Sequence, residues 1–458
     1  MIRNQSQKIE LLGQAPVRRA LLAMGLPTMI GMVIMALYNL ADAYFVAGLG
    51  TGPMGAISVL FPLSQIVVGV ALLFGTGAAS FIARLLGRDD ATHANQVAST
   101  ALYGAMATGA LVIILTMFGM TNVLRLCGAT DGIMPYAVTY TAIYLPFAIF
   151  GIFNVTMNNI ATSEGATRVS MLGMMAGAIA NIILDPILIY WADMGIAGAA
   201  IATAIGMMMS SAIYLHYIFS RKSIFTFRIR DCRFNRENMV EILKIGIPTL
   251  LTNVLTATSV TLTNRAAAPF GDVAIAAMGT AMRILAIGAL MVFGFIKGFQ
   301  PIAGFSYGAR NFDRLRDVTR TAIWWTTTFC AVIGAILIAL RTPIMAQFAA
   351  GNMEMMNIGR TALTAHSAAL VTFGFYTVCS CLFLALGRAR AGLFLGICRQ
   401  GICLIPAIII MPTIWRLNGV LYAQPVADVI ASIIAAVMTL RLQRDIRAMR
   451  DGAAQKKL

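Results

Sequence analysis

Apolar runs long enough to cross a lipid bilayer recur along the whole chain of 458 residues. A membrane-spanning helix needs about 20 mostly apolar residues, and only helices or closed barrels can pair all their backbone groups inside a bilayer. Hydrophobic residues make up 59% of the chain and charged residues only 11%, too little charge to cover a soluble protein of this size. Because the runs lack the alternating ten-residue pattern of a barrel, the sequence predicts an all-α integral membrane protein.

Polar interruptions divide the apolar runs into twelve expected transmembrane helices. They cover residues 20–47, 54–86, 95–120, 134–162, 168–191, 195–219, 240–268, 273–307, 316–341, 356–387, 390–413 and 418–441.

Lys and Arg are concentrated in every second connection between these helices. The basic segments include Arg18 and Arg19, residues 221–244, residues 310–320 and residues 441–457. The positive-inside rule places such connections in the cytoplasm. The sequence therefore predicts a multi-pass protein of the plasma (inner) membrane with both termini cytoplasmic. Since topology accounts for the net charge of +16, no nucleic-acid partner is expected.

The two halves of the chain resemble each other. "GLPT" at 25–28 returns as "GIPT" at 246–249, and the same spacing aligns Gly77 with Gly298 and Gly87 with Gly308. Six spans in each half, inserted in the same direction, form a parallel repeat with a pseudo-two-fold axis along the membrane normal. Two lobes related in this way enclose a central cleft, which is typical of alternating-access transporters. The expected divisions are an N-terminal lobe at 1–219, a cytoplasmic linker at 220–239, a C-terminal lobe at 240–441 and a basic cytoplasmic tail at 442–458.

Three acidic residues lie inside expected spans: Asp42, Asp185 and Asp428. Charges in hydrocarbon are costly and mark functional sites by default. At a helix rise of about 1.5 Å per residue, Asp42 and Asp185 both lie roughly 8 to 9 Å below the outer rim, and Thr203 lies roughly 12 Å below it. Asn181 shares a helix face with Asp185. These oxygens predict a cation site that holds Na+, or a carboxylate pair that carries H+; the residues do not choose between the two ions.

Prolines accompany these polar positions. Pro186 directly follows Asp185 and cannot donate a backbone hydrogen bond, so we expect a bend that leaves a carbonyl free as a further cation ligand. Pro27 and its repeat counterpart Pro248 are expected either to be bending points during transport or to kink their helices for packing.

Other polar residues in the spans carry weaker expectations. Asn158 either extends the cation site or holds helices together by hydrogen bonds. Asp428 is expected either to be functional, as a buried acid, or to pair with Arg399, and the two are expected to be structural or gating residues. Arg283 is expected to reach the outer interface or to line the cleft. His366 is expected to be a buried, satisfied histidine. The expected residues of a substrate cleft are Tyr38, Asn39, Tyr140, Asn154, Lys297 and Gln300.

No enzyme motif is present. The chain has no HExxH, no GxSxG and no cluster of Cys and His with metal-ligand spacing, and the Gly-rich "FGTGAAS" lacks the Lys-Ser/Thr of a phosphate loop. We therefore expect no enzymatic activity and no cofactor other than a coupling ion.

Several motifs together resemble the MATE family of multidrug and toxic compound extrusion transporters, and within it the DinF-like branch. They are "GLPT" and "YNLADAYFVAGLG" in the first span, "NIILDP" in the fifth, "GIAGAAIAT" in the sixth, "KGFQPIAGFSYGAR" in the eighth and "QPVADVIA" in the twelfth. The resemblance implies a monomeric antiporter that exports amphipathic, cationic organic compounds in exchange for Na+ or H+. It also implies a cation-coupling site formed by Asp42, Asn158, Asn181, Asp185 and Thr203.

A flippase for lipids or lipid-linked oligosaccharides is the alternative, because related families share the two-lobe architecture. Such a protein needs a cationic cleft for phosphate groups, and Lys297, Arg399 and Arg283 are the residues that could supply one. The paired acids of the first lobe favour the antiporter.

Overall fold

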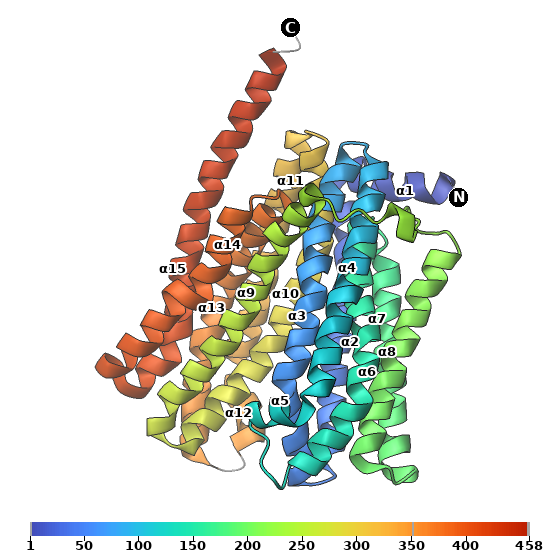
Figure 1. The fold of residues 1–458 in the computed structure, drawn as a ribbon. Coiled ribbons are helices and arrows are strands. Elements are labelled where there is room, and N and C mark those ends of the chain that lie inside the picture. Colours follow the sequence, from blue (N-terminus) through green and yellow to red (C-terminus); the bar gives the residue numbers. More distant parts are fainter. Residues whose placement is uncertain (1, 350–351, 456–458) are drawn as a thin grey trace.

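The structure, a computed structural model, describes residues 2–349 and 352–455, which form a bundle of long helices (Figure 1). We call the helices up to α8 the first half and those from α9 onward the second half. The first half comprises α1 (Ile2–Gly13), α2 (Val17–Ala47), α3 (Thr51–Gly87), α4 (Ala91–Phe118), α5 (Met120–Leu126), α6 (Met134–Ser163), α7 (Thr167–Pro186), the π-helical η1 (Ile187–Trp191) and α8 (Gly195–Phe219). After η2 (Ile229–Asp231), the second half comprises α9 (Arg236–Ala267), η3 (Ala268–Phe270), α10 (Asp272–Gly308), α11 (Phe312–Ala339), α12 (Arg341–Ala349), α13 (Met353–Ala385), α14 (Ala389–Ile397), the π-helical η4 (Cys398–Leu404) and α15 (Ile405–Gln455).

Within the described residues, eleven helical segments are long and apolar enough to span a membrane. The last one, Ala389–Ala448, has 60 residues and reverses direction at Arg416, whose backbone adopts φ 49° and ψ −130°. Figure 1 shows the two arms on either side of this reversal, the second rising to the C-terminus. Since this segment crosses twice, the structure agrees with the twelve expected crossings.

Three short helices were not expected from the sequence: α1, α5 and α12. None is long enough to cross a bilayer, so a search for apolar runs of spanning length does not detect them. The expected tail is also helical, because the second arm of α15, after Arg416, continues to Gln455. Residues 456–458 of that tail lie outside the described residues.

The helices of the two halves pack in the same order. In the first half α3 packs on α6, α2 on α7, and α7 on α8. In the second half the corresponding contacts join α10 to α13, α9 to α14, and η4 to α15. A repeated contact pattern agrees with the internal repeat expected from the sequence.

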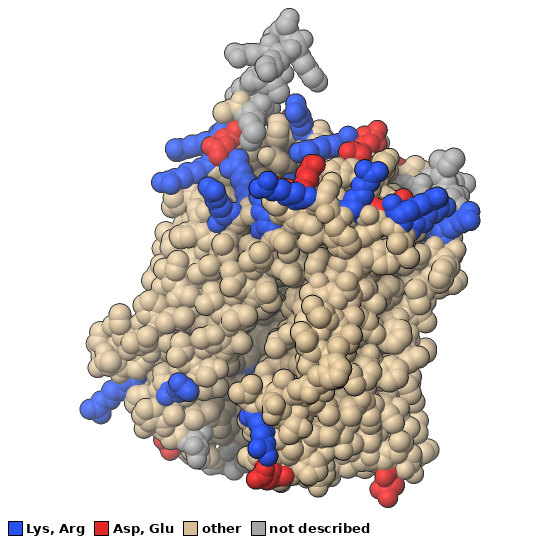
Figure 2. All heavy atoms as spheres, in the orientation of Figure 1, with Lys and Arg blue, Asp and Glu red and all other residues tan. Residues whose placement is uncertain are grey.

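Lys and Arg side chains gather at the end of the bundle where both termini lie, which we call the basic end (Figures 1 and 2). Between this end and the opposite end, the face drawn in Figure 2 is almost entirely uncharged. This band is the part of the surface suited to hydrocarbon.

Glycines bring the two halves into backbone contact near the basic end. A methyl group added at Gly77 of α3 would lie 2.1 Å from the Ile242 carbonyl oxygen of α9. A methyl group at Gly298 of α10 would lie 2.5 Å from the Gly25 nitrogen of α2. We call this set of contacts the seam. Gly77 and Gly298 are repeat counterparts, so each half places the equivalent glycine against the first spanning helix of the other half, at positions one turn apart.

Polar side chains reinforce the seam. The Arg84 guanidinium of α3 donates to Glu241 Oε2 of α9 at 2.9 Å, and Ser80 Oγ donates to the Leu384 carbonyl oxygen at 2.5 Å. Toward the opposite end, no glycine of α2 beyond Gly25 lies against the second half in the described residues. Figure 2 shows the surface hollowed between the halves on that side. The bundle is therefore closed at the basic end and has a cleft toward the other end.

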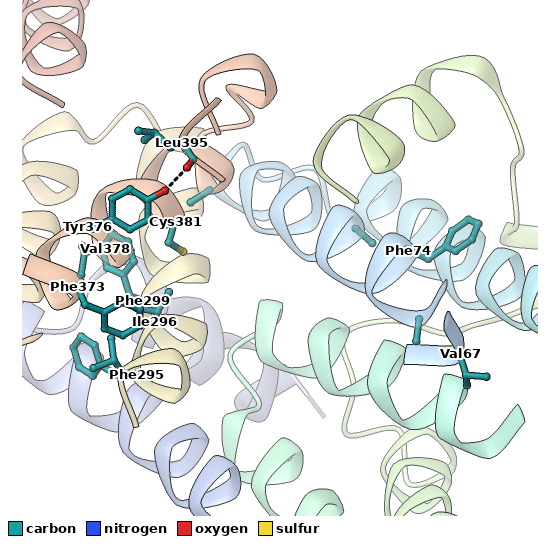
Figure 3. Close-up of a cluster of buried hydrophobic side chains, with 14 of the residues drawn as sticks. Val67, Phe74, Phe295, Ile296, Phe299, Phe373, Tyr376, Val378, Cys381 and Leu395 are labelled. Atoms are coloured by element: carbon teal, nitrogen blue, oxygen red, sulfur yellow. Dashed lines mark hydrogen bonds between the residues drawn. The ribbon is translucent and has the colours of Figure 1, made fainter. Parts of the chain in front are cut away.

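Aromatic packing supports α10 behind the seam. Ile296 and Phe299 of α10 belong to one buried cluster with Phe373 and Tyr376 of α13 (Figure 3), and Phe295 packs on Trp325 of α11. The Tyr376 hydroxyl donates to the backbone carbonyl of Leu395 in α14. These contacts fix the helix that carries Lys297 and Gln300.

Helix α1 is attached to both halves. The Arg314 guanidinium of α11 donates to the carbonyls of Leu12 and Ala15, at 3.2 and 2.6 Å, and so caps the C-terminal end of α1. Lys8, two turns earlier, donates to the Tyr217 hydroxyl and to the Lys222 carbonyl, and its ammonium lies 3.8 Å from Glu164 Oε2. A helix of 12 residues thus joins the second half to the first at the basic end.

Candidate functional site

Four polar residues from three helices converge in the first half, and we call this cluster the acidic pocket. It consists of Asp42 on α2, Asn181 and Asp185 on α7, and Thr203 on α8. Asp185 is completely buried, and Asn181 and Thr203 are nearly so. The two carboxylates are close enough to interact electrostatically. The sequence predicted that these four residues share one level, and the structure places them together.

The amide of Asn181 links the cluster. In the orientation that satisfies both of its polar groups, its nitrogen donates to Asp185 Oδ2 at 2.8 Å. Its oxygen accepts from the Thr203 backbone N–H at 3.2 Å and from the Thr203 hydroxyl at 3.3 Å. The Asn181 amide therefore fixes the position of Asp185 relative to α8.

Within the acidic pocket, Asp42 has a carboxylate oxygen without a hydrogen-bond donor. Its Oδ1 is buried and makes no hydrogen bond with any described residue. A buried carboxylate oxygen without a donor is costly, and a cation or a proton would satisfy it. Two carboxylates with amide and hydroxyl oxygens suit a hard cation, whereas the described residues contain no cluster of three or more His, Cys, Asp or Glu side chains that could bind a transition metal.

Tyrosines enclose the acidic pocket. The Tyr140 hydroxyl of α6 lies 3.5 Å from Thr203 Oγ1, and Tyr38 of α2 lies one helical turn before Asp42. Tyr140 was expected in the substrate cleft, but the structure buries it beside the pocket. A nearby hydroxyl can donate to a carboxylate, so these residues bear on the charge state of the acids as well as on substrate contact.

Asn158 was expected in the cation site, and the structure places it elsewhere. It lies about five turns, or roughly 27 Å, along α6 from Tyr140. Its Oδ1 accepts from Lys297 Nζ at 3.0 Å, and its Nδ2 donates to the Tyr214 hydroxyl at 3.1 Å. Asn158 therefore belongs to a contact between α6, α8 and α10 near the basic end.

The other expected cleft residues fall into three groups. Asn154 holds helices together, because its amide donates to the Met207 carbonyl at 2.8 Å and accepts from Ser211 Oγ at 2.7 Å. Asn39 is exposed and donates only to its own helix, at Met35. Lys297 and Gln300 are half-buried and line one small hollow between α10 and α6. This last pair directs donor groups into the hollow.

Arg399 and Asp428 form the ion pair expected for the second half. Arg399 Nε donates to Asp428 Oδ1 at 2.8 Å and its Nη2 donates to Oδ2 at 3.2 Å, a two-point contact. Gln424 adds a hydrogen bond to Oδ1 at 2.6 Å. Both carboxylate oxygens of Asp428 accept hydrogen bonds, whereas Asp42 Oδ1 accepts none from the described residues. Asp428 therefore has a structural role that Asp42 does not share.

The structure also locates Arg283 and His366, for which the sequence analysis stated expectations. Arg283 is exposed; it precedes Lys297 by 14 residues, close to four helical turns, so the two lie on the same side of α10. His366 is buried, but its Nε2 makes no hydrogen bond with the described residues, so the expectation of a fully satisfied histidine is wrong.

The three prolines lie at distinct structural features. Pro186 ends α7, and the chain continues as the π-helical η1. The proline thus marks a change from α-helix to π-helix directly after Asp185. Pro27 and Pro248 are inside α2 and α9, next to Gly25 and Gly246 of the seam.

Glu164 is a buried polar centre that the sequence did not single out. It is fully buried at the end of α6, where it accepts from the Tyr217 hydroxyl, from Ser223 Oγ at 3.1 Å and from the Ile224 N–H at 2.7 Å. Burial raises the pKa of the Glu164 carboxyl, while Lys8 nearby acts in the opposite direction. Burial also lowers the pKa of the Lys8 ammonium. Its position at the end of an expected span made Glu164 resemble an ordinary connection residue.

The family model named MatE matches the chain twice, at residues 27–187 and 248–410. The chain belongs to the MATE family. The two matched segments begin at Pro27 and Pro248, the repeat counterparts, and each covers most of one half.

Individual relatives and solved structures agree with this assignment. The chain is 28% identical to "Multidrug export protein MepA" of Staphylococcus saprophyticus and 29% identical to the protein of the same name from Staphylococcus aureus strain NCTC 8325 / PS 47. Each match spans 433 residues, 94% of this chain and 95% of the relative. Among solved structures, a MATE protein in the straight conformation is 26% identical with a TM-score of 0.91, covering 96% of this chain and 99% of that chain. An outward-facing conformation of a multidrug resistance MATE transporter is also 26% identical, with a TM-score of 0.90 and coverage of 96% and 98%.

Proposed function

We propose that the chain is a secondary active antiporter that exports amphipathic organic compounds in exchange for Na+ or H+. The observation that carries the proposal is the acidic pocket, in which a buried oxygen of Asp42 lacks a donor and Asp185 lies within electrostatic range. Membership of the MATE family supports it, as does the similarity to relatives named multidrug export proteins. Cationic drugs and dyes are the first substrate class to test.

Coupling follows from the charge of the pocket. The two carboxylates of the acidic pocket repel each other when both are charged. A bound cation or proton removes that repulsion, so ion binding lowers the free energy of the first half. Exchange requires that the ion and the substrate favour different states of the cleft. In this structure the seam closes the basic end, so the cleft side is the one from which an ion enters.

The membrane orientation is part of the proposal. The positive-inside rule places the basic end in the cytoplasm, which makes the structure outward-facing and both termini cytoplasmic. We further propose a plasma (inner) membrane location, a monomer, the DinF-like branch of the family, and the division into lobes at 1–219 and 240–441 with a linker at 220–239. The cation site would then comprise Asp42, Asn181, Asp185 and Thr203.

The flippase alternative loses most of its support. Of the three basic residues it would need in the cleft, Arg399 is neutralised by Asp428, and Arg283 lies roughly 21 Å along α10 from Lys297, too far to share one phosphate with it. Lys297 alone remains, and one ammonium is a poor match for a lipid phosphate that many donors would bind.

The proposal is tested by dye efflux from vesicles that contain the purified protein, with sodium and pH gradients imposed separately. We expect export under at least one gradient, and loss of at least 90% of it in Asp42→Asn and in Asp185→Asn, a loss of the size expected when a charged ligand of a buried site is removed. Asp193→Asn is the matched control, because Asp193 is exposed in the connection after η1. Full export by both pocket variants would rule out the pocket, and no export by the native protein under either gradient would rule out the function.

A further inference from the structure

Lys297 carries a positive charge inside the bundle without an acidic partner. Its ammonium donates to the neutral Asn158 Oδ1 at 3.0 Å, and no described carboxylate acts on it electrostatically. The other inward-facing basic residues differ, since Arg84 is paired with Glu241 and Arg399 with Asp428. An unpaired charge at membrane depth is expensive to keep, so its missing partner is expected to come from outside the chain.

Lys297 lies at the closed end of the cleft. Its neighbours on α10, Gly294 and Gly298, both press against the backbone of α2, at Met29 and Gly25. They are the seam contacts of α10 nearest the cleft, and Lys297 projects from the adjoining face toward α6. A ligand that enters between the halves therefore meets this ammonium where the halves come together.

Gln300 completes a pair of donors. It follows Lys297 by one helical turn, so the two side chains share a face of α10. Both line the small hollow that Asn159 and Thr162 of α6 border on the other side. Gln300 makes no side-chain hydrogen bond within the described part of the chain, and the Lys297 ammonium has three donors of which Asn158 uses one.

We propose that Lys297 and Gln300 form an anion-binding subsite that takes the carboxylate of a transported compound. A carboxylate has two acceptor oxygens, which match an ammonium and an amide N–H one turn apart. Asn158 is the positioning residue: Tyr214 holds its amide nitrogen, and its oxygen aims the ammonium into the hollow. The inference rests on the proposed export function, and it extends the substrates from cations to zwitterions and organic anions.

The test compares two forms of one dye: a rhodamine with a free carboxylate and its methyl ester. Efflux and binding by the full-length protein are measured for both, and the readout is the preference for the acid over the ester. We expect Lys297→Gln to lower this preference by about tenfold, the effect of losing one charge-assisted hydrogen bond. Lys297→Arg, which keeps the charge, should retain most of it.

Gln300→Leu gives an independent reading, because it removes a donor and leaves the charge in place. It should lower the same preference by about threefold. Arg316→Gln is the control, since it removes an exposed charge on α11 and should leave the preference unchanged.

The outcomes separate the two proposals. If the native protein exports the ester but Lys297→Gln and Gln300→Leu both leave the preference unchanged, the subsite is wrong and the export function stands. If Lys297→Gln reduces acid and ester by equal factors, the ammonium serves transport in general and the carboxylate subsite is again wrong. If the native protein moves neither dye under either gradient, both proposals fail.

Discussion

Gly87 and Gly308 face each other's helices across the pseudo-two-fold axis. A methyl group at Gly87 would lie 2.2 Å from the Phe305 carbonyl oxygen, and one at Gly308 would lie 2.1 Å from the Arg84 carbonyl oxygen. Gly87 thus packs on Phe305, three positions before Gly308, and Gly308 packs on Arg84, three positions before Gly87. The seam is therefore symmetric, and its closeness depends on the absence of side chains from both partners.

Gly298→Ala tests the seam directly. Its new methyl group would meet the backbone of α2, which cannot move aside as a side chain can, so we expect the closed arrangement to lose about 1 to 3 kcal/mol. Spin labels at positions 88 and 310, which are exposed at the basic end, should report a longer and broader distance distribution in the variant.

Gly279→Ala is the matched control for that experiment. It makes the same substitution in the same helix, but nothing lies within 4 Å of the added methyl group. The distance distribution should be unchanged. An equal broadening in both variants would mean that helix propensity, and not the seam, determines the closure.

Arg399 and Asp428 should be coupled in a double-mutant cycle. Asp428→Leu alone leaves a guanidinium without its carboxylate, at an expected cost of about 3 to 5 kcal/mol. Arg399→Met together with Asp428→Leu removes both charges and should be less destabilised than the sum of the single variants. Unfolding of the purified protein measures the coupling, and additive costs would show that the pair contributes little.

Glu164 should make stability depend on pH. Because burial raises the pKa of its carboxyl in the folded protein, the folded state binds this proton more tightly than the unfolded chain does. Its contribution is therefore full below the ordinary value of 4.5 and is lost as pH rises through the raised pKa. Melting temperatures across this window should fall more steeply for the native protein than for Glu164→Gln. Glu237→Gln, at an exposed acid on α9, should behave like the native protein.

Arg314→Ala should loosen α1. The substitution removes the donors to the carbonyls of Leu12 and Ala15, so the last turn of α1 loses its cap at a cost of about 1 kcal/mol. Hydrogen exchange of the α1 amides should become several-fold faster. Arg316→Ala, at an exposed position on the same helix, should leave exchange in α1 as it is.

Much of the fold follows from the sequence because the bilayer restricts the choices. The twelve crossings follow from apolar length, and the repeat from the matched spacing of "GLPT" and "GIPT". The grouping of Asp42, Asn181, Asp185 and Thr203 follows from depth along three helices. The depth of a residue in the membrane follows from its position along its helix and from the helix rise. These four residues could therefore be grouped without coordinates.

Contacts between the halves could not be predicted in this way. Asn158 was considered for the cation site as a polar residue in a span and assigned to it by resemblance, although its depth differed from that of Asp185 by several turns. Its partner Lys297 is 139 residues away, in the other half, and no local pattern indicates such a pairing. Glu164 was missed for a related reason, since its burial depends on Tyr217 and on the segment at 223–224.

The double attachment of α1 limits how the halves can separate. One end of this helix is held by Arg314 of the second half, and Lys8 is held by groups of the first half. The helix is only about 18 Å long, so it cannot stretch to follow two bodies that move apart at the basic end. Opening on that side must break one of these two attachments, and whichever breaks first decides which half carries α1 with it.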